Sequence, residues 1–576
     1  MSRDWQMVAS EVGSGPPRPM PQLIWQMLHN RGFALAESVE EVLNPSLANL
    51  RDPGSLDQMP IAVERLLRAR EKGERICIYA DFDLDGTSGC ALMLAGFQQL
   101  GFTDVIYYQP RRLSEGYGLH QSAIDAIAER DCQLLVTVDV GITAVEAVTY
   151  AKSRGLDVII TDHHLPKAGS IPEALAVINP NKGSCSSQLH HLSGAGVAFY
   201  LILALAKQLR ELGRLDESMY QPKRLLDCFA IGTLTDLVPL KSENRVLIKH
   251  GLISLAKTNR PGLRELLKAL NLWGRPLTST DVAIRFAPKL NALSRLELGI
   301  LPIDLFLEVN EEVARSKVQQ VIEFNQIRVS LQKEAEAKVL NEFANQTVPA
   351  VIKFCTSFHR GVVGLVATRV AQELGVPAFI GAVDDEGRVV GSARIPPGSP
   401  VHLPKLLQEA SQVLDHYGGH AAAAGFQLSV SKEKEFAKLV KSQLGKAAEK
   451  VQHIPVLYYD GVAQVEELNP MFMSWCEHLE PFGTAFATPL FRIVKLAITQ
   501  CKVLRGGHLK LRLRQGDELI EAVWFSPPKD HFIHGWVATG ESREAIDILA
   551  EPQWNYFAGK RTLQLLIQDL RWHEPN

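Results

Sequence analysis

The segment Ile76–Gly86 reads ICIYADFDLDG, an apolar run that leads into three alternating aspartates. Further apolar runs follow at DVIYY (104–108), LLVTV (134–138) and DVIIT (157–161), with helical patterns between them. Strands that alternate with helices form βαβ units with right-handed crossovers and a mostly parallel sheet. Because ligands bind at the carboxyl ends of such strands, we expect the polar residues after each run to gather at one edge of the sheet.

The composition is that of a folded protein with several domains. The chain has 576 residues, 61 Lys+Arg against 64 Asp+Glu, and 46% hydrophobic residues. That length allows about three or four domains. The formal net charge of −3 provides no global basic field, so any contact with nucleic acid must come from local basic surfaces. Eight scattered cysteines without a CxxC pair indicate reduced core residues, and not a zinc site or a disulfide framework.

The sequence shows no targeting or membrane-spanning segment. The N-terminal residues lack the cationic start and apolar run of a signal peptide. The longest apolar run, Ala195 to Ala206, is too short to span a bilayer. We therefore expect a protein of the cytoplasm that does not associate with a membrane.

The pattern along the chain predicts five regions. Residues 1–70, Pro-rich and then helical, are expected to be a lead-in that packs on a catalytic α/β domain over 71–310. The charged stretch 311–345 has apolar residues at helical spacing and predicts an amphipathic connecting helix. A second α/β unit with Gly-rich turns follows over 346–450, and short strands and turns dominate 455–576.

One strand of the last region carries a basic face. Three leucines alternate there with four basic residues, His508, Lys510, Arg512 and Arg514. A period of two puts the basic groups on one face and the leucines underneath. The segment predicts a half-buried strand with a cationic outer face.

The sharpest chemical signal is the trio Asp81, Asp83 and Asp85 directly after an apolar strand. Carboxylates this close repel one another unless a cation is present, so they predict a site for a hard divalent metal. An EF-hand loop also begins DxDxDG, but it needs a bidentate carboxylate at its twelfth position, where this chain has Leu92. The other alternative is a solvated acidic turn.

Metal-capable side chains also follow two later strands. Asp139 ends LLVTV, and Asp162, His163 and His164 end DVIIT. Taken alone, Asp139 is typical of a helix cap, and adjacent histidines are typical of a surface loop. Their recurrence at successive strand ends favours one shared site.

A fourth carboxylate element, DCFAIGTLTDLVPL, contains Asp227 and Asp236. Asp236 lies where a helical run breaks before Pro239, so it is either a ligand or a turn former. Mixed Asp and His ligands suit Mn²⁺ or Mg²⁺, whereas structural zinc prefers thiolates. Two such ions could activate a water molecule and clamp both oxygens of a phosphate displacement.

YADFDLDG, TVDVG, TDHH and GTLTDLVPL, in this order, resemble the four motifs of the DHH phosphoesterase superfamily. The likeness continues through PRRLSEGYGL, LSGAGVAFYL, RPGL, FAPKLNALSRL, FHRGVVGLVATRV, GSARIPPG and GGHAAAAGF. Nearly the whole chain thus resembles the RecJ family of bacterial single-strand-specific 5′→3′ DNA exonucleases. The resemblance implies an α/β fold with a parallel-sheet DHH catalytic domain, a long helix to a second α/β DHH-associated domain, and a C-terminal β-barrel (OB-fold).

The resemblance also implies a reaction and its setting. It implies hydrolysis of phosphodiester bonds of single-stranded DNA from the 5′ end, with Mn²⁺ or Mg²⁺ and two ions in the site. It further implies a role in recombination and repair beside a helicase and a single-strand-binding protein.

Individual roles follow from the same resemblance. The implied metal ligands are Asp81, Asp83, Asp85, Asp139, His163 and Asp236. The implied catalytic residues are Asp83, Asp139, His163 and His164. The implied substrate contacts are Arg112, His164, Arg394 and His420. The alternatives are a surface arginine at Arg112 and tight turns around Arg394 and His420.

Aromatic residues in the last region would complement its cationic strand. The resemblance to an OB-fold makes them candidate stacking platforms for unpaired bases. The candidates are Trp524, Phe525, Trp554, Tyr556 and Phe557. We expect several of them to be core residues instead.

Two departures from the family pattern concern positioning and not ligation. Val140 stands where the family commonly has Asn, and NALSRL, which contains Arg295, stands where NAAGRL is common. Neither change removes a metal ligand, so they bear on the rate and not on the reaction class.

Two other functions stay open. One is a DHH phosphodiesterase of short oligonucleotides or cyclic dinucleotides; such relatives are usually shorter and lack an OB-like tail. The other is an inactive DNA-binding scaffold, a class that tends to lose the carboxylates present here.

Overall fold

The chain forms two units in a computed structural model, one made of Met1–Leu50 with Ile454–Asn576 and the other of Arg51–His453. The structure describes residues 4–8, 15–16, 19–33, 35–167, 169–344, 346–448, 456–528, 531–535, 545–557 and 559–574. Among these residues, no helix has the length and apolar character needed to cross a membrane.

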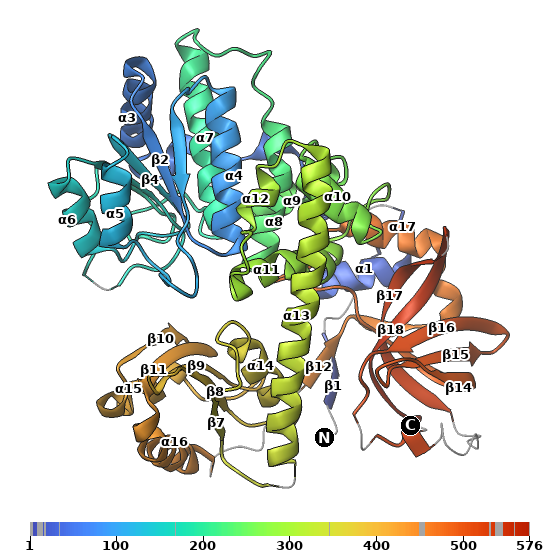
Figure 1. Cartoon of the computed structure of the whole chain (residues 1–576). Helices are drawn as coiled ribbons and strands as arrows, with labels where there is room; N and C mark the ends of the chain where they lie inside the picture. Colours follow the sequence, from blue (N-terminus) through green and yellow to red (C-terminus); the bar gives the residue numbers. More distant parts are fainter. Residues whose placement is uncertain are drawn as a thin grey trace. The chain divides into compact units, whose positions relative to one another are not determined.

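The parallel sheet that the sequence predicts lies in the unit Arg51–His453, in the order β3-β2-β4-β5-β6 (Figure 1). Its strands are β2 (Ile76–Ala80), β3 (Val105–Tyr108), β4 (Leu134–Val138), β5 (Asp157–Thr161) and β6 (Ala176–Ile178). Every neighbouring pair is parallel. The central strands β2 and β4 are buried along their whole length, as expected for a parallel sheet with helices on both faces.

Helices cover both faces of this sheet. On one face, α5 (Gln121–Ala128) and α6 (Val145–Ser153) share an apolar core with β2, β4 and β5. On the other face, α4 (Leu84–Gln99) and α7 (Gly194–Glu211) contact β2 and β4, and α3 (Met59–Lys72) contacts β6. The same two layers are visible in Figure 1. The loops that follow the strands lie at the carboxyl edge of this sheet.

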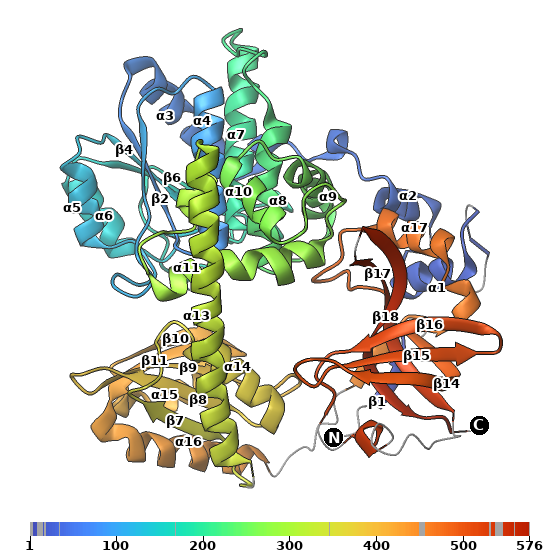
Figure 2. The same cartoon turned by 45° about the vertical axis from the view of Figure 1, so that its right-hand side comes forward.

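A group of helices follows the sheet and ends in the predicted connecting helix. These helices are α8 (Leu226–Thr235), α9 (Ser242–Ala256), α10 (Pro261–Ala269), α11 (Ala287–Leu296), α12 (Ile303–Phe306) and α13 (Glu311–Phe343). Asn310 caps α13 by accepting hydrogen bonds from the backbone N–H groups of Glu312 and Val313. α13 contacts α10, α11 and α12 near its start and α14 (Val363–Leu374) further along (Figures 1 and 2).

The second α/β domain contains a mixed sheet in the order β10-β11-β9-β8-β7. Its strands are β7 (Val351–Cys355), β8 (Ala378–Val383), β9 (Arg388–Arg394), β10 (His416–His420) and β11 (Ala423–Ser429). β7 and β8 are parallel and the other pairs are antiparallel. α13 and α14 cover one face, and α15 (Leu403–Glu409) and α16 (Glu433–Ala448) cover the other.

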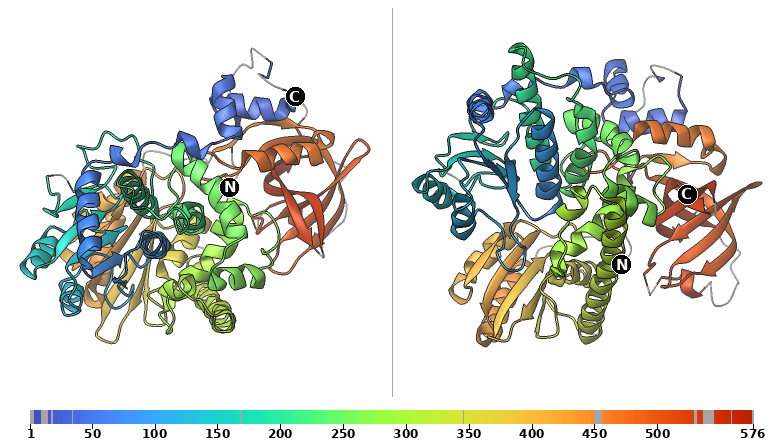
Figure 3. Two further views of the ribbon diagram at one scale, coloured as in Figure 1. Left: turned by 90° about the horizontal axis from the view of Figure 1, so that it is seen from above. Right: turned by 45° about the horizontal axis from the view of Figure 1, so that its top comes forward.

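The C-terminal strands close into a barrel of the predicted OB-fold type, drawn in orange to red in Figure 3. The strands are β13 (Gly461–Ala463), β14 (Phe491–Val503), β15 (Leu509–Gln515), β16 (Glu518–Trp524), β17 (Ile546–Phe557) and β18 (Lys560–Trp572). They run in the order β13-β14-β15-β16-β18-β17, and pairing of β14 with β17 closes the barrel. On β15, Leu509, Leu511 and Leu513 are buried and the basic residues between them face outward, as predicted.

The structure divides the expected lead-in over residues 1–70. Its first part belongs with the barrel, because α1 (Gln22–Asn30) and α2 (Ala36–Leu43) share a core with the barrel and α17 (Pro470–Leu479). Arg31 also binds the carboxylate of Asp460 through two nitrogens, each at 2.7 Å. An apolar helix such as α1 needs a partner surface, but its own sequence does not say which one. Only the part from Arg51 onward belongs with the catalytic domain.

A short parallel pair completes the barrel unit. β1 (Asp4–Met7) runs beside β12 (Val456–Tyr459). Trp5 of β1 packs with Tyr459 and Leu549 and donates a hydrogen bond from Nε1 to Asp569 at 2.8 Å. The beginning of the chain is thereby tied to the barrel.

Candidate metal centre

The predicted ligands meet at the carboxyl edge of the first sheet. Asp81 follows β2, Asp139 follows β4, His163 lies in the loop after β5, and Asp236 lies at the C-terminal end of α8. Among the described residues, three groups of possible ligands have their ligand atoms within 4.8 Å of one another. The group of Asp139, His163 and His164 includes a histidine that is not a predicted ligand. The predicted ligands alone form two groups. One group is Asp81, Asp83 and Asp139, and the other is Asp85, His163 and Asp236.

Backbone N–H groups hold the first carboxylates in place. Asp83 caps α4, and its Oδ1 accepts hydrogen bonds from the N–H groups of Asp85 and Gly86 at 2.8 and 3.0 Å. Asp85 is buried and accepts the N–H groups of Gly194 and Ala195, at the start of α7, at 2.6 and 3.1 Å. Helix N-termini favour negative charge, so α4 and α7 together stabilise carboxylates that would otherwise repel one another.

Glycines make the close packing around these carboxylates possible. A Cβ atom on Gly194 would lie 2.4 Å from the Cβ of Asp139, and one on Gly232 would lie 2.6 Å from Oδ1 of Asp85. Both distances are far below van der Waals contact. Gly194 belongs to LSGAG and Gly232 to AIGTL, so both motifs are explained by the approach of a helix to a ligand.

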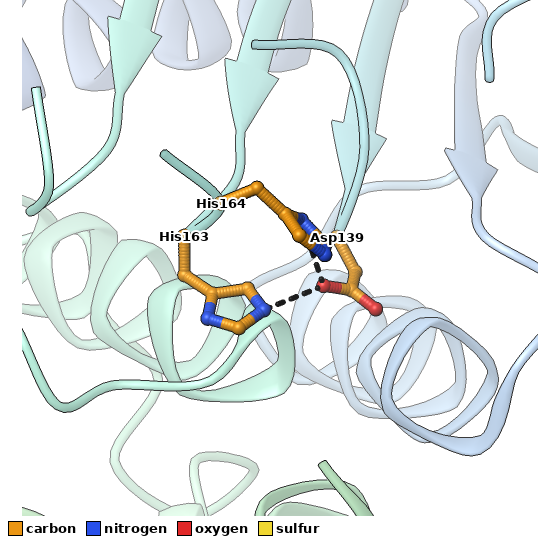
Figure 4. Close-up of side chains that lie close together, drawn as sticks. All are labelled: Asp139, His163 and His164. Atoms are coloured by element: carbon orange, nitrogen blue, oxygen red, sulfur yellow. Dashed lines mark ion pairs between the residues drawn. The ribbon is translucent and has the colours of Figure 1, made fainter. Parts of the chain in front are cut away.

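Asp139 and His163 face each other at the middle of the site (Figure 4). Asp139 has a left-handed backbone (φ 64°) that turns its side chain toward the loop after β5. Its Oδ1 lies 3.1 Å from Nε2 of His163, which in turn is 3.4 Å from Oδ2 of Asp236 and 4.0 Å from Oδ2 of Asp85. Both Oδ1 of Asp139 and Nε2 of His163 are buried without a hydrogen-bond partner among the described residues. Buried atoms in this state fit a cation bound between them.

The carboxylates resist ionisation as long as no cation neutralises them. Burial and the charge of Asp83 raise the pKa of Asp85 to about 7, and burial and Asp85 raise that of Asp236 to about 8. Burial, together with neighbouring carboxylates, also raises the pKa of Asp81 and Asp139 well above the usual range. A divalent ion would reverse this balance, since oxygen ligands of Mg²⁺ or Mn²⁺ are ionised carboxylates. We refer to Asp81, Asp83, Asp85, Asp139 and Asp236 as the carboxylate cluster.

The two adjacent histidines lie in opposite charge states. Burial and the neighbouring His164 lower the pKa of His163 to about 4, which keeps it neutral, as a metal ligand must be. Burial alone would lower the pKa of His164, but the hydrogen bond with Asp162 and the charges of Asp162, Asp236 and Asp81 together outweigh burial and raise that pKa to about 9. Nδ1 of His164 lies 2.8 Å from Oδ1 of Asp162. His164 is therefore a positively charged group beside the ligands.

The structure assigns Asp162 a supporting part that its sequence position does not reveal. It is fully buried and accepts hydrogen bonds from the N–H groups of Ile142, His163 and His164 at 2.9, 2.7 and 3.0 Å. The carboxylate of Asp162 is bonded to His164 and to backbone N–H groups, so it is not among the carboxylates that could hold a metal ion. In the sequence, the only indication of a role for Asp162 is its position beside two histidines.

Gln109 and Val140 also take structural parts beside the ligands. The amide nitrogen of Gln109 donates to the carbonyl of Asp81 at 2.6 Å and to the hydroxyl of Thr87 at 2.7 Å. Val140, the departure from the family's Asn, is buried in the apolar core shared with α5 and α6. Sequence reasoning missed Gln109, because a glutamine after a strand carries no metal signal.

Three arginines come together beside the carboxylates. Arg112 lies in the loop after β3 with its guanidinium 4.9 Å from the ring centre of Phe82, Arg295 lies on α11, and Arg394 ends β9. Burial and repulsion by Arg112, Arg328 and Arg394 lower the pKa of Arg295 to about 9. Burial and Arg112 likewise lower the pKa of Arg394. We refer to Arg112, Arg295 and Arg394 as the arginine cluster.

Carbonyl and hydroxyl groups, and not carboxylates, hold Arg295 and Arg394. Arg295 donates to the carbonyl of Gly361 at 3.2 Å, and Arg394 donates to Ser392 Oγ at 2.7 Å and to the Ala393 carbonyl at 2.8 Å. No ion pair between the arginine cluster and a carboxylate is found in the part of the chain that the structure describes. Half-buried cations of this kind fit an anionic ligand such as a phosphate.

The remaining predicted contacts are less closely tied to the site. His420 is exposed at the end of β10. In the barrel, Trp524 belongs to the core, and Trp554 lies under the guanidinium of Arg561 at 3.9 Å. Phe525 and Tyr556 are exposed. The side chain of Phe557 is outside the described part of the chain.

Three domain families match successive parts of the chain. Residues 75–233 match the DHH family, N-terminal domain, residues 347–446 match the DHHA1 domain, and residues 459–569 match the RecJ OB domain. These segments coincide with the first sheet, the second sheet and the barrel.

Named relatives and solved structures match almost the whole chain. The single-stranded-DNA-specific exonuclease RecJ of Salmonella typhimurium is 32% identical over 96% of each chain. RecJ of Escherichia coli is 30% identical, also over 96% of each chain. The crystal structure of Thermus thermophilus RecJ in complex with Mn²⁺ superposes with a TM-score of 0.79 at 27% identity, covering 97% of this chain and 76% of that one. A Mg²⁺ complex from the same organism gives a TM-score of 0.72 at 26% identity, covering 97% and 75%. The chain therefore belongs to the RecJ family of the DHH phosphoesterases.

Proposed function

We propose that this protein is a metal-dependent exonuclease that hydrolyses phosphodiester bonds of single-stranded DNA, in the 5′→3′ direction. The observation that carries the proposal is the meeting of Asp139, His163 and Asp236 at the edge of a sheet that matches the DHH family. Oδ1 of Asp139 and Nε2 of His163 are buried there without a hydrogen-bond partner among the described residues. The relatives of similar length bear the name single-stranded-DNA-specific exonuclease, and solved relatives hold Mn²⁺ or Mg²⁺.

We propose that the predicted ligands hold two ions. Asp81, Asp83 and Asp139 would hold one, and Asp85, His163 and Asp236 would hold the other, since each trio offers its ligand atoms within 4.8 Å. Bound there, divalent ions would supply an activated water and neutralise charge on the reacting phosphate. Asp83 and Asp85 enter this arrangement already oriented, because backbone N–H groups fix their carboxylates.

The chain's own cations would bind and orient the phosphate. His164 stays protonated at neutral pH because Asp162 holds its Nδ1, so its other ring nitrogen can donate a hydrogen bond to a phosphate oxygen. Arg112 and Arg394 approach from two different domains, and a planar guanidinium can bind two phosphate oxygens at once. These groups would position the scissile or terminal phosphate for attack. The exposed His420 is proposed as a more distant contact to the strand.

We place the enzyme in the cytoplasm, in DNA recombination and repair beside a helicase and a single-strand-binding protein. The family membership supports this setting. The cationic face of β15 offers an additional surface for single-stranded DNA, with Arg512 and Arg514 exposed on it.

Release of label from the two ends of one strand tests the proposal. A single-stranded oligonucleotide labelled at its 5′ or its 3′ end is incubated with Mn²⁺, with Mg²⁺ or with a chelator, next to a blunt duplex of the same sequence. We expect metal-dependent early loss of the 5′ label from the single strand and slow attack on the duplex. Metal-independent release, or 3′ label lost first, would contradict it. Cleavage confined to di- to pentanucleotides would favour the oligonucleotide phosphodiesterase, and binding without cleavage the scaffold.

A further inference from the structure

The connecting helix carries a half-buried cation that forms no ion pair with a carboxylate among the described residues. Arg328 of α13 donates from Nη2 to Oδ1 of Asn325 at 2.8 Å and from Nη1 to Oε1 of Gln332 at 2.7 Å. Both partners are neutral amides of the same helix. Its Nε is buried with no hydrogen-bond partner among the described residues. A guanidinium held in this way is oriented but not neutralised.

A second cation, Lys289, lies on the neighbouring helix α11. Lys289 belongs to α11, which packs against α13, and its side chain is half-buried. In the described part of the chain, Lys289 makes no ion pair and no hydrogen bond through its ammonium group. Burial and the charges of Arg328 and Arg285 lower the pKa of Lys289. Two half-buried cations at a helix contact therefore repel each other.

The charges around this pair are predominantly positive. The charge of Arg328 also helps to lower the pKa of Arg295, which belongs to the arginine cluster. The charge of Glu336 acts in the opposite direction and favours the charged form of Arg328. Glu336 also accepts a hydrogen bond from Gln332 at 2.6 Å. Arg285 on the other side is paired with Asp281 at 3.1 Å. One shared acid and several cations leave an excess of positive charge around Arg328 and Lys289.

We propose that Arg328 and Lys289 form a second phosphate subsite, which binds a phosphate of the same single strand one or a few nucleotides beyond the one at the arginine cluster. The inference rests on the proposed function. It adds a contact made by the connecting helix, which neither the family motifs nor the metal centre assigns. An anion is the ligand that such a pair lacks, and the DNA backbone presents anions at regular spacing. The track would hold the strand while the terminal nucleotide is cut.

Binding of single strands at several salt concentrations tests this subsite. Arg328→Gln and Lys289→Gln are compared with Lys333→Gln, which removes an exposed charge from the same helix. The full chain is used with a chelator, so that the strand stays intact. Each subsite variant is expected to weaken binding about tenfold and to lower the slope of log affinity against log salt by about 0.7. Lys333→Gln is expected to bind as the wild type does, and none of these variants should unfold at a lower temperature.

A strand with one uncharged methylphosphonate linkage locates the contact. The linkage is moved stepwise through the first five positions from the 5′ end. At one or two adjacent positions it should weaken binding by the wild type, but not weaken binding by Arg328→Gln any further. The subsite is wrong if no position shows this coupling, or if Lys333→Gln behaves like Arg328→Gln. Failure of the proposed function is separate, because the wild type would then cleave no single strand with Mn²⁺.

Discussion

The carboxylate cluster and the arginine cluster are opposite solutions to the same electrostatic problem. The carboxylates gather at one sheet edge and are fixed by backbone N–H groups, as Asp85 is by Gly194 and Ala195. The arginines come from the loop after β3, from α11 and from β9. Carbonyl and hydroxyl groups hold Arg295 and Arg394, as the Gly361 carbonyl does for Arg295. In each cluster, hydrogen bonds from the protein hold side chains of the same charge type close together. The carboxylate cluster is therefore built locally, whereas the proposed phosphate contacts come from two different domains.

Removal of one shared carboxylate should cause the largest loss. Asp139→Asn keeps the shape of the side chain and removes a charge that faces His163. We expect the hydrolysis rate of single-stranded DNA to fall by about 10³-fold, together with a loss of Mn²⁺ binding measured by calorimetry. Binding of the strand in chelator should persist, because the arginine cluster is intact. Asp216→Asn, in a surface loop, serves as the control and should behave like the wild type.

Removal of one arginine should affect the substrate and spare the metal. Arg295→Gln is expected to lower kcat/KM for a 5′-phosphorylated strand by about 10- to 100-fold. The affinity for Mn²⁺ without DNA should stay within about twofold, since Arg295 belongs to the other cluster. Steady-state kinetics and calorimetry on one preparation separate the two effects. Equal losses in Mn²⁺ affinity for Arg295→Gln and Asp139→Asn would show that the clusters are not separate.

A metal ion should relieve the repulsion within the carboxylate cluster and stabilise the catalytic unit. At a Mn²⁺ concentration 100 times the dissociation constant, linkage adds about 2.7 kcal/mol to the free energy of unfolding. Thermal unfolding with and without Mn²⁺ measures this gain. Asp139→Asn should lose the gain, and without metal it should be at least as stable as the wild type, because a neutral amide replaces a buried carboxyl group whose ionisation is disfavoured. A variant that still gains the full shift with Mn²⁺ would contradict the assignment of Asp139 as a ligand.

A buried carboxylate outside both clusters should give the smallest effect. Burial raises the pKa of Glu551, in the barrel, to about 7, although Gln568 donates a hydrogen bond to it at 2.9 Å. Since the folded state then holds a proton that the unfolded state loses at about pH 4.5, stability falls as the pH rises from about 4.5 to 7. Glu551→Gln should remove this fall and stabilise the barrel unit by about 1 to 3 kcal/mol at pH 8.

Unfolding at pH 4 and pH 8, with and without Mn²⁺, measures the effect at Glu551. The pH dependence assigned to this residue should not respond to the metal. A gain at pH 4 equal to the gain at pH 8 would show that packing, and not ionisation, is responsible.

The residues at the strand ends could be predicted from the sequence, because the carboxyl ends of parallel strands all lie at the same edge of the sheet. Apolar runs that end in Asp81, Asp139 and His163 place all three residues at one edge, whatever the rest of the chain does. The barrel strand β15 was predictable for the same local reason, since its leucines alternate with basic residues.

Contacts between distant segments could not be predicted in this way. The role of Gly194 depends on the hydrogen bond that its N–H donates to Asp85, where α7 begins. The supporting role of Asp162 depends on the N–H of Ile142, which belongs to another loop. The position of α1 in the barrel unit depends on a partner surface more than 400 residues later, and Arg31 meets Asp460 there. In the sequence, Arg328 resembles any polar residue of a solvated helix, and only the packing of α11 against α13 shows that it is half-buried. Such features follow from tertiary packing, which a local pattern does not record.

The coupling between metal and strand tests most directly whether the two clusters act on one substrate. The dissociation constant of Mn²⁺ is measured with and without a 5′-phosphorylated single strand whose first linkages resist hydrolysis. Because a phosphate between the clusters contacts the ions and the arginines together, we expect the strand to tighten Mn²⁺ binding at least about tenfold. Arg295→Gln should remove most of that gain. Equal Mn²⁺ affinity with and without the strand, together with metal-independent hydrolysis, would contradict the proposed site.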